Sequence, residues 1–335
     1  MTTLFKENEK FNRTFLLKAI SSGKTRGGKP FVTLTLGTPQ QDFEGRLWDT
    51  DLETLPSLLP GDPVNAAGTA VLYQERIQLK VDRIAGETSA IDPRSLYPSS
   101  EFSEEELGIS WRKWVKKITD ENLNALFAAI ERDGAFMKDF LRSPAAVTMH
   151  HARIGGLAEH SLGVCALAGA VGEKYTWLRP DILIAGALLH DIGKVREYEI
   201  ARAFQVSTEG RLMGHIALGI PMLKSYIEKV PGFPEALALE LYHIILSHHG
   251  KLELGSPKAP SIPEALVVHY ADDLDAKLDM LRASRISSSR EGAGDPPGEY
   301  VRGLGRFFLF PGDEKPVIRK NPSGKTGADD QGKLF

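Results

Sequence analysis

All histidines of this 335-residue chain lie in one segment, between residues 150 and 269. Imidazole groups serve as metal ligands and as general acids or bases, so this confinement indicates that the chemistry of the chain is concentrated in one domain. Independent core or surface histidines are the alternative, and for any single histidine taken alone that interpretation is favoured. The set comprises His150, His151, His160, His190, His215, His243, His248, His249 and His269.

The segment 13–90 has a different pattern. Short stretches at 31–36, 64–71 and 77–81 alternate apolar and polar residues or are rich in β-branched residues, and Gly and Pro separate them. Several short strands in so short a segment predict a small β-barrel.

The composition and apolar spacing of the chain after residue 90 predict the domain boundaries. Pro, Ser and Glu dominate between 92 and 110, whereas apolar residues recur at helical spacing from Trp111 until Pro144 ends the run. Helical patterns continue to about 284, after which Ser, Gly, Pro and mixed charge predominate. We expect an N-terminal extension at 1–12, a barrel at 13–90, a linker with helices at 91–145, an all-α domain at 146–284 and a flexible tail at 285–335.

Composition limits the class of protein. Hydrophobic residues make up 42% and charged residues 25% of the chain, values typical of a globular protein. The net charge of -3 excludes a histone-like basic binder but allows a local basic groove. No apolar stretch approaches the length of a membrane span, residues 1–10 lack an apolar signal core, and Cys165 is a single cysteine. We expect a cytoplasmic protein without a membrane partner.

An apolar segment at 181–189 is predicted to form a buried helix that leads directly into His190 and Asp191. His160 lies near the start of another predicted helix. A divalent cation needs several nitrogen and oxygen ligands that converge from different helices, and this pattern supplies them. Buried histidines that bond only to backbone carbonyls are the alternative. Further candidate ligands downstream are His215, His248, His249 and Asp272.

These residues resemble the HD-domain metal-dependent phosphohydrolases, which are defined by a His, then His-Asp, then a distant Asp. The longer motifs resemble the YhaM family, 3′-to-5′ exoribonucleases with an N-terminal OB-fold and a C-terminal HD domain. The resemblance covers roughly residues 13–284 and is weaker over the barrel. It rests on HHA at 150–152, GGLAEHS at 155–161, HDIGK at 190–194, GHI at 214–216, LSHHGK at 246–251, GSP at 255–257 and HYADDLDA at 269–276.

The resemblance implies a multidomain fold, an all-β OB-fold barrel followed by an all-α HD domain, and two metal ions. Asp191 would bridge them, because a carboxylate can use both of its oxygens. Asp273 and Asp275 compete with Asp272 for the last ligand position; the register of the motif favours Asp272 and leaves Asp275 to support a ligand. The core ligands would be His160, His190, Asp191 and Asp272, and His215, His248 and His249 would complete a second site.

Hydrolysis of a phosphodiester needs a hydroxide at neutral pH and compensation for charge on the phosphate oxygens, and a metal pair provides both. Asp191 and Lys194 are the expected catalytic residues. The Lys194 ammonium would contact the scissile phosphate or the leaving group, and an exposed lysine at a helix start is the alternative. The imidazole-rich ligand set favours Mn²⁺, with Fe²⁺, Co²⁺ and Mg²⁺ as alternatives.

Other residues in the motifs are expected to bind substrate. His150 and His151 precede the first ligand and are expected to contact substrate phosphate or to cap a helix. Lys251 and Ser256 lie in motif segments and are also assigned to substrate. His243 and His269 lie in apolar helical stretches and are expected to be structural.

An OB-fold holds single strands through a basic groove and stacking aromatic residues. Each aromatic candidate could instead belong to the barrel core. The core is favoured for Trp48, neither interpretation is favoured for Phe31, and Tyr73 is expected to be exposed. The candidate nucleic-acid contacts are Lys24, Arg26, Lys29, Phe31, Trp48, Tyr73 and Arg76.

The function expected from this combination is a metal-dependent 3′-to-5′ exonuclease that releases nucleoside 5′-monophosphates from single-stranded RNA, with single-stranded DNA as an alternative partner. The preference for RNA rests on the resemblance alone. A nucleotide or cyclic-nucleotide phosphohydrolase, which would not need the barrel, is the alternative enzyme. A non-catalytic nucleic-acid or nucleotide-binding module is the alternative of another class. A homo-oligomer is left open.

Overall fold

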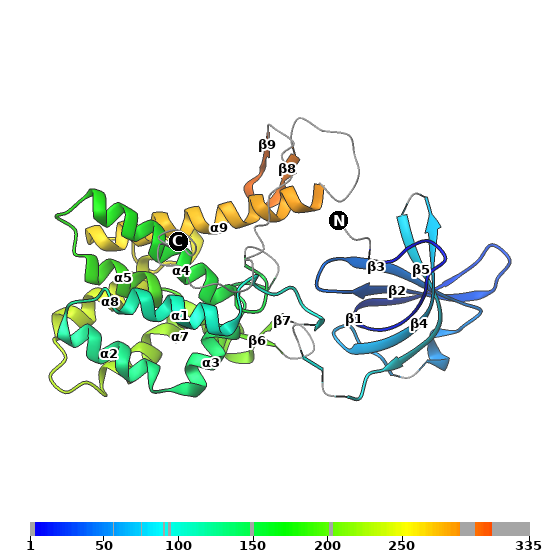
Figure 1. The fold of residues 1–335 in the computed structure, drawn as a ribbon, viewed down its shortest axis with the longest axis horizontal. Helices are drawn as coiled ribbons and strands as arrows, with labels where there is room; N and C mark the ends of the chain where they lie inside the picture. The colour runs from blue at the N-terminus through cyan, green and yellow to red at the C-terminus, as the bar shows by residue number, and fades with distance from the viewer. Residues whose placement is uncertain are drawn as a thin grey trace, which may run out of the picture. The chain divides into compact units, whose positions relative to one another are not determined.

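The computed structural model describes residues 4–55, 57–74, 76–89, 91–92, 95–147, 151–200, 204–288 and 299–309. The chain divides into two compact units (Figure 1). The first, the β unit, comprises residues 1–101 and 198–206, and the second, the helical unit, comprises residues 102–197 and 207–335.

The β unit is built on a closed barrel with the strand order β1-β2-β3-β5-β4. Strand β3 pairs with β5 in parallel, whereas the other pairs are antiparallel. This closed five-stranded arrangement is consistent with the predicted OB-fold. The strands are β1 (Lys10–Lys24), β2 (Pro30–Gly37), β3 (Asp42–Trp48), β4 (Pro63–Tyr73) and β5 (Arg76–Gly86), and a 3-10 helix, η1 (Leu52–Thr54), follows β3.

The barrel closes around an apolar core because alternate strand residues point inward. Val32, Leu34 and Leu36 of β2 are fully buried, and the residues between them are only partly buried. Phe5 precedes β1 and packs edge-to-face on Phe43, with 5.0 Å between the ring centroids. Period-two burial is the pattern that predicted strands in this part of the chain.

A short hairpin interrupts the helical part of the sequence. Strands β6 (Tyr198–Ile200) and β7 (Phe204–Val206) pair with each other, and the Phe204 ring lies 5.0 Å from that of Tyr97 within the β unit. The prediction that the chain is helical to about residue 284 is wrong at this hairpin, since two strands of three residues are too short to leave a periodic signal.

The helical unit buries its most apolar helix at its centre. Helix α5 is buried from Ile182 to Leu189, and α4, α8 and α9 pack against it. Its helices are α1 (Glu104–Val115), α2 (Glu121–Glu131), α3 (Gly134–Arg142), α4 (Gly156–Lys174), α5 (Pro180–Leu189), α6 (Lys194–Glu197), α7 (Thr208–Ile227), α8 (Glu235–Ser247), the 3-10 helix η3 (Leu252–Leu254) and α9 (Pro263–Ser288).

The helices that precede the motif region belong to the same core. Trp111 of α1 packs on Phe127 of α2 and Phe140 of α3, with ring centroids 5.6 Å and 4.9 Å away. All three side chains are part of one buried cluster with residues of α4 and α5. Helices α1 to α3 therefore share a hydrophobic core with the helices that carry the histidines.

The segment expected to be a flexible tail contains a small hairpin. Strands β8 (Glu299–Val301) and β9 (Arg306–Phe308) pair around the 3-10 helix η4 (Arg302–Leu304), and β8 contacts α9. Val301 is buried, whereas Phe307 is exposed. In the described part of the chain, no helix combines the length and the apolar character needed to span a membrane.

Candidate metal centre

The first group of candidate ligands combines residues from three helices. His160 lies near the start of α4, His190 ends α5 and Asp272 lies on α9. Nε2 of His160 is 3.0 Å from Oδ1 of Asp272 and 3.3 Å from Nε2 of His190. The donor atoms of these three side chains all lie within 4.8 Å of one another, and both histidines are buried. This first donor group could share one cation.

A second donor group lies where α7 and α8 meet the same region. His215 belongs to α7, His248 ends α8 and His249 follows it. Their donor atoms again lie within 4.8 Å of one another. The ring centroids of His248 and His249 are 4.3 Å apart, and that of His215 is 5.5 Å from His248. Three imidazoles at this separation form a nitrogen-rich site suited to a transition ion.

Two glycines allow His215 to reach this position. The backbone of Gly214 has φ 71° and ψ 159°, values that break α7 immediately before His215 and that an L side chain rarely adopts. At Gly193, a Cβ atom would collide with the carbonyl oxygen of His215. The absence of a side chain at residue 193 therefore lets α7 approach the turn that follows Asp191.

Asp191 connects the two donor groups. Its Oδ2 lies 3.3 Å from Nε2 of His190 and 3.6 Å from Nε2 of His160. Its Oδ1 lies 3.4 Å from Nε2 of both His215 and His248. One oxygen of the carboxylate thus faces each group, which is the geometry of a bridging ligand.

Buried polar atoms at this point need a partner. Oδ1 of Asp191 and Nε2 of His215 and of His248 are inaccessible to solvent, and within the described part of the chain they make no hydrogen bond. Burying such atoms without a partner costs free energy, and a metal ion among them would remove that cost. The residues therefore fit a divalent metal.

The second ring nitrogen of each candidate histidine faces an acceptor. An acceptor at Nδ1 holds a proton on that nitrogen and leaves the Nε2 lone pair for a cation. Hydrogen bonds to backbone carbonyls therefore account for the Nδ1 atoms of these histidines. They do not explain why the Nε2 atoms lie close together. The acceptors are Ala187 O for His190, Ile245 O for His248, Leu254 O for His249 and Asp275 Oδ2 for His160, at 2.8, 2.8, 2.7 and 2.7 Å, and the carboxylate oxygen Oε2 of Glu197 lies 3.1 Å from Nδ1 of His215.

Protonation states agree with this assignment. Burial lowers the pKa of His248 and of His249, so both rings stay neutral at neutral pH. Burial would raise the pKa of Asp191, but the nearby Lys194 ammonium and the neighbouring imidazoles hold it well below its usual range. Burial would lower the pKa of His160, yet its hydrogen bonds to Asp272 and Asp275 raise it to about 10. A positive charge is thus favoured at His160, where a cation would bind.

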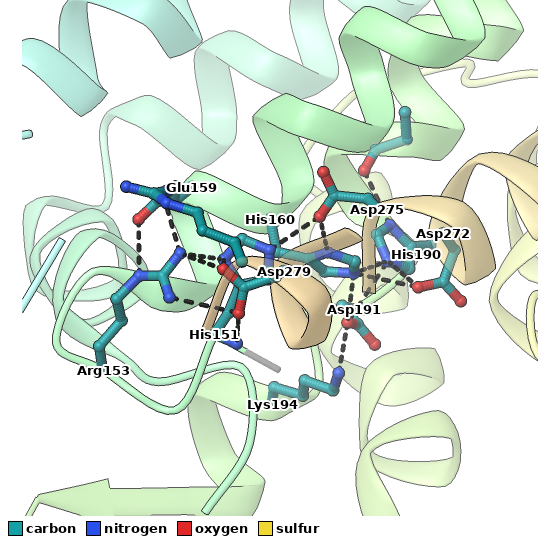
Figure 2. Close-up of polar contacts among 12 residues, drawn as sticks. His151, Arg153, Glu159, His160, His190, Asp191, Lys194, Asp272, Asp275 and Asp279 are labelled. Carbon is teal, nitrogen blue, oxygen red and sulfur yellow. Dashed lines mark hydrogen bonds and ion pairs between the residues drawn. The ribbon is translucent and has the colours of Figure 1, made fainter. Parts of the chain in front are cut away.

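Lys194 begins α6 and is buried, with Nζ 2.6 Å from Oδ2 of Asp191. The alternative of an exposed lysine at a helix start is wrong. Figure 2 shows its ammonium directed at Asp191, on the side that faces His160 and His190. A donor in this position could bond a phosphate oxygen beside the metal ligands.

Two of the residues predicted to bind substrate, His151 and Ser256, are buried and bonded to other protein groups. His151 is buried and both of its ring nitrogens contact protein side chains. Ser256 is fully buried, and its hydroxyl accepts a hydrogen bond from the backbone N–H of His249 at 3.0 Å, so it supports the loop after α8. Lys251 is exposed and its role stays a prediction. His150 lies outside the described residues.

Sequence reasoning missed Glu197 at the end of α6. Its carboxylate faces both the ring Nδ1 and the backbone N–H of His215, each at 3.1 Å. No periodicity or motif in the sequence pointed to it. His243 and His269 lie outside both donor groups, and His269 bonds through Nδ1 to the carbonyl of His248.

On the barrel, Phe31 and Trp48 face each other across β2 and β3, with 5.3 Å between ring centroids. The Arg46 guanidinium lies 4.9 Å from the Phe31 ring. Trp48 is 43% exposed, so its predicted place in the core is wrong, while Phe31 is half-buried and Tyr73 is exposed as expected. Lys24, Arg26, Lys29 and Arg76 are also exposed.

Residues 157–277 match the family model of the HD domain. The helical unit contains an HD domain. The matched range includes every predicted metal ligand, and HD domains bind divalent metals. This confirms the predicted HD domain, and together with the donor groups it supports a metal-dependent phosphohydrolase. The narrower YhaM assignment stays a prediction.

One solved structure similar to this chain is the HD domain of the phosphodiesterase PgpH from L. monocytogenes. The two sequences are 18% identical, and the alignment covers 48% of this chain and 83% of that chain, with a TM-score of 0.30.

Proposed function

We propose that this chain is a divalent-metal-dependent phosphodiesterase that removes nucleoside 5′-monophosphates from the 3′ end of single-stranded RNA. The observation that carries the proposal is the position of Asp191, whose two carboxylate oxygens face separate donor groups. Two bound divalent ions would supply a hydroxide at neutral pH and would compensate charge on the phosphate oxygens.

The residues of the chain have distinct parts in this proposal. His160, His190 and Asp272 would hold one ion, and His215, His248 and His249 the other, with Asp191 common to both. Lys194 would donate a hydrogen bond to a nonbridging or leaving oxygen of the scissile phosphate, where negative charge increases during bond cleavage. Burial of this ammonium strengthens its interaction with a phosphate, because little water screens it.

The barrel supports a nucleic-acid substrate. Phe31 and Trp48 present adjacent rings on which bases could stack, and Arg46 beside them adds a positive charge. The turn between β1 and β2 carries exposed basic side chains that could contact the phosphate backbone. The 3′-to-5′ direction and the preference for RNA rest on the family resemblance, and the choice of Mn²⁺ rests on the imidazole-rich ligand set. Single-stranded DNA remains the alternative strand.

The test uses 5′-labelled single-stranded RNA with a free 3′ hydroxyl and Mn²⁺. We expect a ladder that shortens from the 3′ end with release of nucleoside 5′-monophosphates, and we expect a 3′-phosphate to slow it. Asp191→Ala is the control and should produce no ladder. Equal cleavage of circular RNA would contradict an exonuclease. Hydrolysis of free or cyclic nucleotides without RNA cleavage would favour the alternative enzyme, and RNA binding without any hydrolysis would favour a binding module.

A further inference from the structure

A chain of polar side chains extends from the metal donors to Arg153 (Figure 2). Oδ2 of Asp275 lies 2.7 Å from Nδ1 of His160 and 2.9 Å from Nε2 of His151. A single carboxylate oxygen of Asp275 therefore faces ring nitrogens of both imidazoles. An ionised carboxylate only accepts hydrogen bonds, and both imidazoles must donate to it.

The contact with Arg153 determines which ring nitrogen of His151 carries the proton. Its Nη2 lies 2.9 Å from Nδ1 of His151. A guanidinium can donate but cannot accept, so Nδ1 of His151 must be the unprotonated nitrogen and Nε2 must carry the hydrogen. This is the form of His151 that donates to Asp275.

Arg153 is itself fixed from two sides. Its Nε and Nη2 donate to the two carboxylate oxygens of Glu159, each at 2.9 Å. Its Nη2 also lies 2.8 Å from Oδ1 of Asp279 on α9. Glu159 precedes His160 on α4, so the same arginine joins α4 to α9 beside the first donor group. A paired guanidinium of this kind has little freedom to move.

The backbone of His151 is held in an unusual conformation. Its φ of 47° lies in the left-handed region, which is uncommon for a residue with a side chain. Its N–H donates to Oδ2 of Asp279 at 2.6 Å, and its carbonyl accepts from the N–H of Arg153 at 2.8 Å. Such strain persists where the surroundings fix it, and it frequently marks a functional position.

We propose that His151 is a positioning residue for the first metal ion: fixed by Arg153, it holds Asp275, and Asp275 keeps the Nε2 lone pair of His160 directed at the ion. This inference rests on the metal centre of the proposed function but not on the identity of its substrate. His151 therefore acts through another residue and does not contact the phosphate.

His151, His160 and Asp275 are also close enough to hold a metal ion by themselves. Two contacts oppose this use. The Arg153 guanidinium places a positive charge beside His151, and His160 Nδ1 is already hydrogen-bonded to Asp275. A third ion would have to displace that proton in the presence of a fixed cation.

The test is Mn²⁺ binding to the metal-free full chain by calorimetry, with native mass spectrometry for the number of ions. His151→Asn suits the left-handed backbone but is too short to reach Asp275, whereas His151→Gln is one methylene longer and keeps an N–H donor. His243→Ala is the matched control, since this histidine lies outside the donor groups and bonds the N–H of Ser261. Circular dichroism confirms that each variant is folded.

We expect the parent and His243→Ala to bind two ions. His151→Asn should weaken one of them by about 10- to 100-fold, which is typical for loss of a residue that orients a ligand, and His151→Gln should recover most of that affinity. Asp275→Asn should weaken binding of the same ion, and adding His151→Asn to it should have little further effect.

Four results would each overturn the inference. They are unchanged Mn²⁺ affinity in folded His151→Asn, failure of His151→Gln to recover the affinity, additive losses of affinity in the double variant, and a third ion in the parent. RNA hydrolysis is measured separately, so a chain that binds both ions but cleaves no RNA would contradict the proposed function and leave the inference intact.

Discussion

Nζ of Lys194 lies 2.6 Å from Oδ2 of Asp191, and both side chains are buried. The ammonium therefore shares an oxygen that also faces His160 and His190. An ammonium here can balance the charge of the carboxylate, and it can bond a phosphate that approaches the same ligands. The two roles predict different consequences when the lysine is replaced.

Lys194→Gln keeps the length of the side chain approximately but removes its charge. We expect kcat for RNA hydrolysis to fall by about 100-fold, the usual effect of removing one donor to developing charge, while two Mn²⁺ ions still bind. Steady-state kinetics and calorimetry measure the two quantities. Lys224→Gln, at an exposed position of α7, is the control. Loss of metal binding with Lys194→Gln would show that the lysine holds the centre together and does not act on substrate.

Glu197→Gln should weaken the second ion. The carboxylate of Glu197 faces both the ring Nδ1 and the backbone N–H of His215, so it fixes the orientation of a candidate ligand. We expect a loss of about 10- to 100-fold in Mn²⁺ affinity for one of two ions, measured by calorimetry. Glu199→Gln, two residues along the chain and exposed, should bind as the parent does. Equal affinities in the two variants would contradict this role.

Metal binding should release a proton at pH 8. In the metal-free protein, hydrogen bonds to Asp272 and Asp275 overcome the effect of burial and raise the pKa of His160 to about 10. His160 is then protonated at pH 8 and must lose its Nε2 proton to bind an ion, so Mn²⁺ affinity should rise as the pH rises toward 10. Calorimetry in buffers of different ionisation enthalpy measures the release, which we expect to be about one proton for the first donor group. Affinity independent of pH between 7 and 9 would contradict this prediction.

Trp48→Ala should weaken binding to long single-stranded RNA. Loss of one stacked base contact costs about 1–3 kcal/mol, which is about 5- to 150-fold in Kd. Hydrolysis of a dinucleotide should be unchanged, because the barrel supplies binding and not chemistry. Trp177→Ala is the control, as this tryptophan is 69% exposed on the helical unit. Fluorescence anisotropy measures the binding, and equal Kd values for both variants would exclude Trp48 from the RNA site.

The predicted metal ligands could be grouped from sequence because each lies in a strong local pattern. The apolar run of α5 places His190 and Asp191 at one end of a buried helix, and the adjacent His248 and His249 end another helix. In the structure, Nε2 of His215 and Nε2 of His248 each lie 3.4 Å from Oδ1 of Asp191. Alternating burial in the barrel strands likewise follows from the pattern of the sequence.

The supporting residues could not be predicted in the same way. His151 and Asp275 are separated by 124 residues, and no periodicity relates them. The sequence therefore predicts that polar residues next to a motif bind substrate, whereas in the structure His151 is bonded to Arg153 and Asp279. The sequence favours a core position for Trp48 over a stacking role, but its position at the end of β3 leaves it partly exposed.

The most direct test of the account is the number of Mn²⁺ ions per chain, measured by native mass spectrometry for the parent and for Asp191→Ala. Asp191 faces both donor groups with its two oxygens, so its removal should disrupt both sites without opening a large cavity in the core. We predict two ions in the parent and no tightly bound ion in the folded variant. Two ions in Asp191→Ala, or none in the parent, would contradict a metal centre bridged by this carboxylate.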